Sequence, residues 1–371
     1  MPCGLQSRHI TAADAMAPNS SSVTEDRGAG DTAHAPQNER RGAGAEPYPN
    51  YRTEVVWPNV VVHAYLNLAA LYGAYLMFTS ARLPTAIWAF ILYEAGILGI
   101  TAGAHRLWSH RAYKATWPLR VFLVLLQTLA FQTSAHEWVR NHRVHHKFSD
   151  TDADPHNVNR GFFFTHYGWM LTKKHPAVKE NGKKVDSSDL DADPLLIFQK
   201  RYYMIIMPIL CFVIPTAVPV FVWNETWSNA YHIAAVMRQV ITLHMTLITN
   251  SVTHWPDTWR KRPYDKRICP SENFFVSLLT LGEGWHNFHH VFPWDYKTSE
   301  IGYNRINPTT HFIDFCARIG LAYDLKTVPT SMVKRRVQRT GDGTHELWGW
   351  GDADMSEAEK KMVQVVNEKA T

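Results

Sequence analysis

The sequence predicts an all-α membrane protein in which four transmembrane helices are capped by a cytosolic, histidine-rich helical domain. Three observations lead to this fold class. Four apolar segments have the length of a membrane span, nine histidines fall into four short groups near segment ends or in the links, and Lys and Arg concentrate on one side.

The four apolar segments are close to the ~20 residues that a helix needs to cross the hydrocarbon core. They cover residues 60–78, 85–104, 204–223 and 230–250. The third contains Pro208, Pro215 and Pro219, which predict kinks in that helix. A fifth apolar run, residues 118–135, separates two histidine groups that would face opposite sides of the membrane if it crossed. We therefore expect that run to be interfacial or buried against the cytosolic domain.

The positive charges indicate which side of the membrane each segment faces. Residues 105–201 contain many Lys and Arg, whereas the short links after the first and third spans contain only Arg82. The positive-inside rule then places both termini and all histidine groups in the cytosol. Glu94 and Arg238 lie inside spans, and because intramembrane charges usually pair, we expect an ion pair between them.

The chain divides into a membrane domain between two tails. Residues 1–54 lack an apolar run and predict a disordered cytosolic tail, and residues 326–371 predict a charged cytosolic tail. Residues 55–325 form the membrane domain, with a cytosolic cap built from 105–203 and 251–325. The net charge of +5 suits an anionic membrane surface or substrate, and no nucleic-acid-binding motif is present.

Nine histidines and one asparagine form four groups, most of which suit one face of a helix. The groups are His105 with His110, His142 with His145 and His146, Asn250 with His254, and His286 with His289 and His290. Residues three and four apart share a helix face, so three of the groups converge if their segments are helical. His105 and His110 are five apart and fit better where a helix ends and the chain bends.

The composition of these groups indicates a shared site for two metal ions. Neutral imidazole is the commonest protein metal ligand, and nine imidazoles exceed what one ion can hold. Scattered cysteines and the lack of a ligand-spaced carboxylate leave an imidazole shell for iron, zinc, copper or nickel. Redox chemistry would favour iron, because zinc has no redox function. A membrane metal transporter or sensor is the alternative, but a transporter's ligands would lie near the midplane of its spans.

Four longer runs around these groups resemble membrane acyl-CoA desaturases of the delta-9 (stearoyl-CoA) type, and the wording is nearest to insect members. The runs are GITAGAHRLWSHRAYKA from Gly99, EWVRNHRVHHKFSDTDADPHN from Glu137, GFFFTHYGWML from Gly161 and GEGWHNFHHVFPWDY from Gly282. The resemblance covers roughly residues 55–325.

This resemblance implies an oxidoreductase of fatty acid biosynthesis that spans the endoplasmic reticulum membrane several times. Such an enzyme inserts a cis double bond into a saturated long-chain acyl-CoA at a di-iron centre (Fe2+/Fe3+), with O2 as co-substrate. Its electrons come from NADPH or NADH through a reductase and cytochrome b5. Another regioselectivity, such as delta-11, and a histidine-box lipid hydroxylase stay open as alternatives.

The resemblance also implies a role for each residue of the four groups. The implied iron ligands are His105, His110, His142, His145, His146, His254, His286, His289 and His290, with Asn250 approaching one iron. Asp150, Asp154 and Glu283 lie near the groups and are candidates to accept the second ring N–H of ligating histidines. His156 belongs to the same motif, but we place it outside the ligand set.

A path for the substrate follows from matching positions. The expected contacts of the CoA phosphates are Arg140, Lys174 and Lys179. The expected residues of the acyl tunnel are Gln132 and Trp138 along its wall, and Tyr93 and Ile97 at its far end. A bulky Ile97 would shorten the chain that the tunnel accepts.

Some positions depart from many relatives. Thr133 stands in place of Asn, Asn141 in place of Asp and Leu247 in place of Trp, and the link after His254 is longer. Because all ten ligand positions are retained, we expect these departures to affect the substrate and the bond position rather than catalysis.

Overall fold

A computed structural model describes residues 48, 51–255, 261–300, 307–345 and 357–362 of the chain. The contacts discussed below all lie within the compact unit that begins at Thr53. Most of the predicted N-terminal tail and most of the long link after His254 (residues 256–260) fall outside the described residues.

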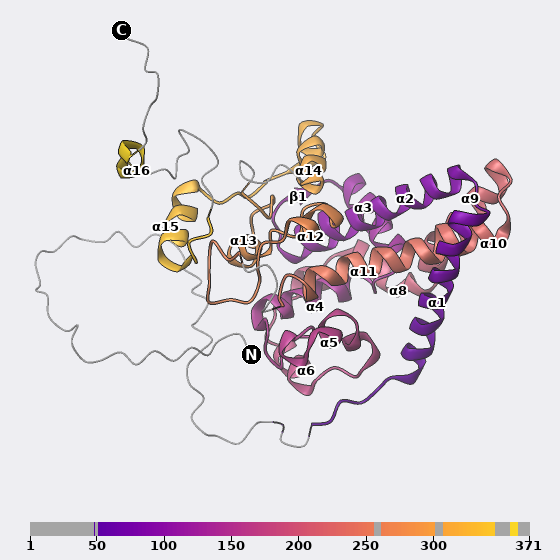
Figure 1. Ribbon diagram of the computed structural model, residues 1–371, viewed down its shortest axis with the longest axis horizontal. Helices are drawn as coiled ribbons and strands as arrows, with labels where there is room; N and C mark the ends of the chain where they lie inside the picture. The colour runs from indigo at the N-terminus through magenta and orange to yellow at the C-terminus, as the bar shows by residue number, and fades with distance from the viewer. Residues whose placement is uncertain (1–47, 49–50, 256–260, 301–306, 346–356, 363–371) are drawn as a thin grey trace, which may run out of the picture. The chain divides into compact units, whose positions relative to one another are not determined.

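The regular secondary structure of the described residues is helical apart from one two-stranded ribbon and isolated bridges (Figure 1). The helices are α1 (Trp57–Thr79), α2 (Leu83–Leu98), η1 (Gly99–Ser109), α3 (Trp117–Leu129), α4 (Ala135–Phe148), η2 (Val158–Arg160), α5 (Phe162–His166), η3 (Gly168–Leu171), α6 (Pro176–Gly182), α7 (Ser188–Asp191), α8 (Pro194–Pro208), η4 (Ile209–Val213), α9 (Ile214–Trp223), α10 (Trp227–Asn229), η5 (Ala230–Met237), α11 (Arg238–Ser251), α12 (Phe274–Leu279), α13 (His286–Val291), α14 (Pro308–Arg318), α15 (Thr330–Thr340) and α16 (Glu357–Met362). Strands β1 (Lys114–Ala115) and β2 (Ala322–Tyr323) pair antiparallel.

Three helices among the described residues are long and apolar enough to cross a membrane. They are Trp57–Thr79, Leu83–Ser109 and Pro194–Trp223, which contain the first three predicted spans. The third helix runs through its prolines by adopting π-helical turns in η4, directly after Pro208. The apolar run at 118–135 forms α3, whose 13 residues are too few to cross. That length agrees with the expectation that this run does not span the membrane.

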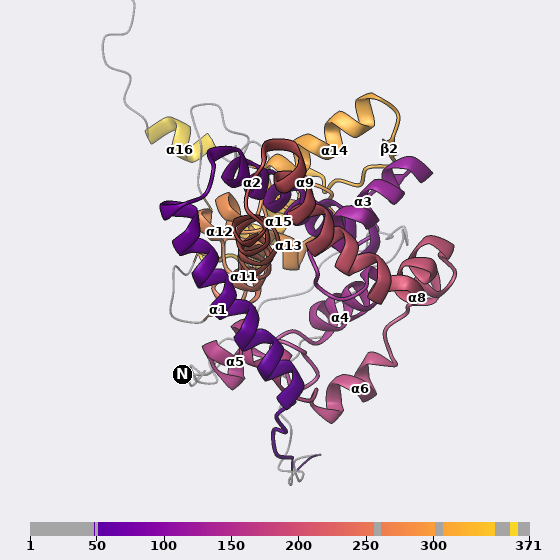
Figure 2. The ribbon, with the colours of Figure 1, turned by 90° about the vertical axis from the view of Figure 1, so that its right-hand side faces the viewer.

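The fourth predicted span is helical, but it is not among these three. It follows α10 and consists of η5 and α11, and its sequence includes Arg238, Gln239 and His244. Helices α1, α2 and α9 all pack against η5, so this helix lies inside the bundle, as the near end-on view in Figure 2 shows. A Cβ atom at Gly73 would lie 2.3 Å from the carbonyl oxygen of His232, so only glycine lets α1 approach so closely. The count of four spans stays a prediction.

The expected ion pair between Glu94 and Arg238 is wrong. Arg238 is buried and donates to the backbone carbonyls of Ala234 (3.2 Å), Leu129 (2.9 Å) and Cys211 (2.8 Å). No ion pair in the described part of the chain joins it to Glu94. Leu129 ends α3, where backbone carbonyls have no partner within the helix, and Cys211 lies in the π-helical turns of η4. The carbonyls of these two residues therefore accept hydrogen bonds from Arg238 in place of a carboxylate.

Candidate metal centre

A π-helix explains the five-residue spacing of the first histidine pair. Residues Gly99–Ser109 form η1, and the backbone N–H of His110 bonds to the carbonyl of His105 at 3.2 Å, an i to i+5 bond. The wider π-helical turn brings residues five apart nearer to one face than an α-helix does. The two rings lie edge to face with their centroids 4.8 Å apart, so both face the same side. The helix also ends here, as the sequence predicted, because His110 is its C-cap.

The nine histidines come together in two sets. One set is His105, His110, His142, His146 and His289, and the other is His145, His254, His286 and His290. Within each set one ring nitrogen of every member lies within 4.8 Å of the corresponding nitrogens of the others. The second group of the sequence is thereby split: His145 faces one set, while its helix neighbours on α4 face the other. Asn250 lies on a cavity wall that also includes His105, His142 and His286.

The ring nitrogens point at one another as the ligands of an ion do. The Nε2 atom of His289 lies 2.9 Å from that of His105 and 3.0 Å from that of His146. In the second set the Nε2 atoms of His286 and His254 are 3.0 Å apart. The Nε2 atom of His145 is buried and has no hydrogen-bond partner among the described residues. A buried, convergent set of imidazole nitrogens fits a pair of transition-metal ions.

Burial keeps most of these rings in the form that binds metal. It lowers the pKa of His110, His142, His146, His286, His289 and His290 well below the usual histidine value, and neighbouring histidines lower it further. Burial also acts to lower the pKa of His145, but the Asp154 carboxylate outweighs it and the pKa rises. Neutral imidazole is the metal-binding form.

Each of the three carboxylates singled out from the sequence contacts the Nδ1 atom of a clustered histidine. Glu283 lies 2.8 Å from His105, Asp154 lies 2.9 Å from His145, and Asp150 lies 3.1 Å from His254. A carboxylate on Nδ1 fixes the tautomer that presents Nε2 to a metal.

Arg106 is a residue of this site that the sequence argument missed. Its buried guanidinium donates to Glu283 (2.8 Å), Thr310 (2.8 Å) and Asn307 (3.1 Å). Burial would raise the pKa of the Glu283 carboxyl, but Arg106 and His105 hold it at about 2. The one feature of the sequence that could have indicated this role is that the charged Arg106 directly follows His105 within an apolar run.

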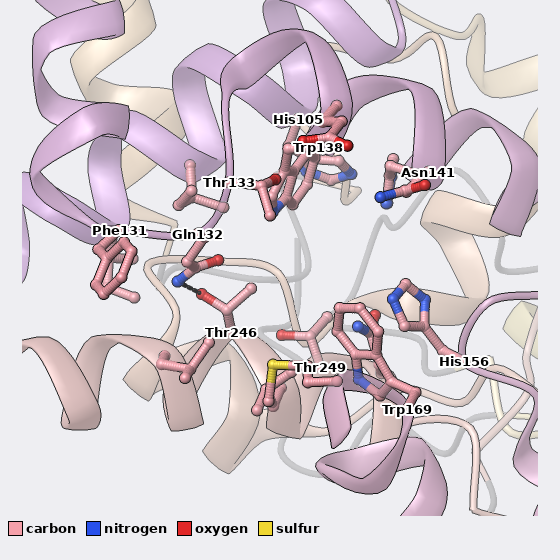
Figure 3. Close-up of a pocket in the computed structure, with 18 of the residues that line it drawn as sticks. His105, Phe131, Gln132, Thr133, Trp138, Asn141, His156, Trp169, Thr246 and Thr249 are labelled. Atoms are coloured by element: carbon pink, nitrogen blue, oxygen red, sulfur yellow. Dashed lines mark hydrogen bonds between the residues drawn. The ribbon is translucent and has the colours of Figure 1, made fainter. Parts of the chain in front are cut away.

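His156 lies beside the second set. With His145 and Asp154 it forms a third group close enough to hold an ion. Burial lowers the pKa of His156 to about 3, so the ring is neutral, and its Nδ1 atom has no hydrogen-bond partner among the described residues. Its ring packs edge-on against Trp169 at 4.4 Å on the cavity wall (Figure 3).

A cavity of about 390 Å³ extends along the histidine sets. Its wall includes His105 and His142 from the first set and His286 from the second. Thr133 and Phe131 have positive φ angles of 66° and 51°, and this unusual backbone presents the intervening Gln132 to the cavity (Figure 3).

Some of the predicted substrate contacts line the cavity, and the others lie outside it. Gln132, Trp138, Ile97 and Lys174 are part of the cavity wall. Arg140 and Lys179 are exposed and lie outside that wall, as does Tyr93, whose hydroxyl donates to the carbonyl of Leu279. The three departures from the family pattern, Thr133, Asn141 and Leu247, all line the cavity, and Lys174 donates to Asn141 at 2.7 Å.

Comparison with known proteins identifies the family. The family model for fatty acid desaturase matches residues 80–323. The chain belongs to the fatty acid desaturase family. An Acyl-CoA Delta-9 desaturase of Acheta domesticus is 62% identical to this desaturase over 310 residues, which are 84% of this chain and 86% of that protein.

Relatives that are named for other double-bond positions are also similar to this chain. An Acyl-CoA Delta12-desaturase of Acheta domesticus is 53% identical over 86% of this chain and 88% of that protein. An Acyl-CoA Delta(11) desaturase of Spodoptera littoralis is 52% identical over 82% of this chain and 88% of its own. This desaturase is therefore an oxidoreductase of the acyl-CoA desaturase group, and identity alone leaves its regioselectivity open.

Proposed function

We propose that this desaturase inserts a cis double bond at the delta-9 position of a saturated long-chain acyl-CoA. Two hydrogens leave adjacent carbons of the chain, and O2, two electrons and two protons account for the release of two water molecules. The observation that carries this proposal is that the cavity wall contains members of both histidine sets, so one elongated ligand can pass both.

The polar end of the cavity suits a CoA thioester. Lys174 and Asn141 lie on the cavity wall. Exposed Arg140 on α4 and exposed Lys179 on α6 add positive charge outside that wall. Phosphates are held well by such cations, so these residues would anchor CoA outside while the acyl chain enters. The double-bond position then depends on how far the chain enters, and the relatives support delta-9 first and delta-11 or delta-12 as alternatives.

The ions that suit this site are two irons. Iron would supply the oxidising power to remove hydrogens from an unactivated chain, which zinc lacks. The nine histidines would hold the ions, with Asn250 close by, while Asp150, Asp154 and Glu283 keep the Nδ1 protons in place. Gln132, Trp138 and the apolar wall would orient the chain and exclude water.

The cellular setting follows from the same proposal. We infer four spans, with the α10–η5–α11 helix as the fourth, and cytosolic termini and histidine sets in the endoplasmic reticulum membrane. Cytochrome b5 and its reductase would deliver electrons to the cytosolic side.

Expression in a yeast that lacks its own desaturase tests the function directly. Growth without added unsaturated fatty acids, with cis-9 products found by gas chromatography after double-bond derivatisation, is the expected result. Alcohol products would indicate a hydroxylase, and products at another carbon would reject the delta-9 assignment. Metal analysis of the purified protein should find two irons per chain, and active protein free of iron would contradict the centre.

A further inference from the structure

One polar side chain on the cavity wall, Gln239, has an oxygen without a hydrogen-bond partner among the described residues. Gln239 is 1% exposed and is part of the cavity wall. Its Oε1 atom makes no hydrogen bond to any residue that the structure describes. A buried amide oxygen without a donor carries its whole desolvation cost, so a native site of this kind calls for an explanation.

Among the wall residues of α11, Gln239 lies farthest along the helix from the histidine His254. The wall residues of α11 are Gln239, Leu243, Thr246, Leu247, Thr249 and Asn250. Most of these follow steps of three or four, which mark one face of a helix. Eleven residues separate Gln239 from Asn250, and at ~1.5 Å per residue this corresponds to about 16 Å along α11.

The polar side chains near Gln239, on the wall and beside it, have partners. Gln132 donates to the Thr246 hydroxyl at 2.8 Å (Figure 3), and that hydroxyl donates to the carbonyl of Thr242 at 3.2 Å. Arg238, next to Gln239, donates to three backbone carbonyls. The unpaired oxygen of Gln239 is thus specific to this position and is not general to the helix.

An entirely apolar acyl tail would leave this oxygen unpaired. Leu66, Ile97 and Phe131 contribute apolar surface to the same cavity, and a hydrocarbon tail in contact with them has no donor to offer Gln239. A site built to hydrogen-bond one substrate group discriminates strongly against an analogue that lacks it, because the analogue leaves the buried polar group unpaired.

We propose that Gln239 is a specificity-determining residue that accepts a hydrogen bond from a donor, such as a hydroxyl, near the distal end of the acyl chain. This inference rests on the proposed function, because it takes the cavity as the acyl tunnel. The substrate class it names is an acyl-CoA oxygenated near its methyl end.

A matched pair of ligands tests the proposal. ω-Hydroxyacyl-CoA molecules are compared with alkyl acyl-CoA molecules one methylene longer, from tetradecanoyl to octadecanoyl, so that each pair has the same number of chain atoms. Displacement of a labelled acyl-CoA from the purified full-length protein in lipid nanodiscs gives the affinity ratio of each pair. At the best length, Gln239→Leu should lower the ratio of hydroxylated to alkyl affinity about 10-fold, as expected for one buried hydrogen bond.

Two variants separate recognition from general damage. Gln199→Leu removes a buried amide that is fully bonded, to Gln127, Thr128 and the N–H of Ala135, and it should leave the ratio unchanged. Leu243→Met changes an apolar wall residue and should alter chain-length preference without altering the ratio.

The outcomes distinguish this inference from the proposed function. The role of Gln239 would be overturned if the ratio of hydroxylated to alkyl affinity in Gln239→Leu stayed within twofold of the wild-type ratio at every chain length. An equal change of this ratio in Gln199→Leu would also overturn it. If alkyl acyl-CoA is still desaturated in that case, the proposed function stands. Failure of the wild type to bind any acyl-CoA would overturn both.

Discussion

The Oε2 atom of Glu283 lies 2.8 Å from the Nδ1 atom of His105, while its Oε1 atom accepts from Arg106 at 2.8 Å. One carboxylate therefore contacts a ring of the first histidine set and also neutralises a fully buried guanidinium. Arg106 in turn donates to Asn307 and Thr310, which belong to the segment that begins α14. The first histidine set and the start of α14 are thus joined through Glu283 and Arg106.

Glu283→Gln should reduce metal content more than it reduces folding yield. The amide keeps the shape but presents a weaker partner to the His105 ring, and loss of such a partner typically lowers metal affinity about 10- to 100-fold. It also leaves the Arg106 charge without its counterion, which costs roughly 3–5 kcal/mol in buried pairs. Metal per chain, measured by mass spectrometry on the folded fraction, and the thermal midpoint check both effects.

Asp324→Asn is the control for Glu283→Gln. Asp324 pairs with Lys114 at the surface, where both side chains are more than half exposed, and such pairs contribute little to stability. The control should keep its metal and its thermal midpoint. Full metal content in Glu283→Gln would contradict the role given to Glu283.

Ile97→Ala should lengthen the preferred acyl chain. Ile97 is 1% exposed and forms part of the cavity wall, so its removal extends the space available to the chain end. The truncation also costs roughly 2–5 kcal/mol of folding free energy, so the product profile must be taken from folded protein. Fatty acid analysis in the yeast host should show longer unsaturated products. Leu196→Ala, at a buried site outside this wall, should destabilise the protein and leave the profile unchanged.

The Asp189 carboxylate should stabilise the contact of α7 with α4 and with the end of η1 only above acidic pH. Partial burial would raise the pKa of its carboxyl, but hydrogen bonds from Arg143 and Arg111 hold that pKa well below its ordinary value. The pKa of the Asp189 carboxyl is lower in the folded protein than in the unfolded chain. Its stabilisation is therefore fully present above the pKa of the unfolded chain and is lost as the pH falls through the pKa of the folded protein. Asp189→Asn should lower stability by roughly 1 kcal/mol at neutral pH, since water screens these pairs.

The pH dependence of Asp189→Asn is measured as the difference in thermal midpoint from the wild type. That difference should be constant from neutral pH down to about pH 4, the ordinary range of an aspartate, and should shrink below it. A difference that grew on acidification would contradict the sign of the pKa shift.

The sequence was sufficient where chemistry repeats at helical spacing. Steps of four residues share a helix face, and His142 and His146 do lie in one set and His286 and His290 in the other. The remaining member of each group, His145 or His289, faces the opposite set, which the spacing did not predict. The sequence was insufficient where the backbone leaves standard geometry. The π-helix that brings His105 and His110 together begins at Gly99, which packs so closely on α3 that a Cβ atom there would lie 2.3 Å from the backbone nitrogen of Gln127.

The partners of buried charges were also beyond the sequence. Spacing placed Glu94 and Arg238 at similar depth, but it could not reveal that carbonyls at Leu129 and Cys211 surround the guanidinium. The same holds for Arg106, whose partners come from segments far along the chain. Such partners depend on tertiary packing, which no local pattern encodes.

A chain of polar side chains links α1, α5 and α11. The Nε2 atom of His166 lies 3.0 Å from the Nδ1 atom of His244, and the Nε2 atom of His244 lies 3.2 Å from the Oδ1 atom of Asn67. Asn67 uses its amide N–H on the carbonyl of His63, so its oxygen can only accept. Neutral His244 must therefore donate to Asn67 and accept from His166.

This ordered arrangement predicts that His166 and His244 are energetically coupled. His244→Leu leaves the His166 donor and the Asn67 oxygen unpaired, so it should cost about 1–3 kcal/mol. His166→Leu should cost a similar amount, and the double variant should cost about 1 kcal/mol less than the sum, because the second change removes a partner already lost. Thermal midpoints of the four proteins in nanodiscs give the coupling. Combining His166→Leu with His232→Leu, whose ring bonds to Ser228 in its own helix, should be additive, and equal coupling in both pairs would reject the chain.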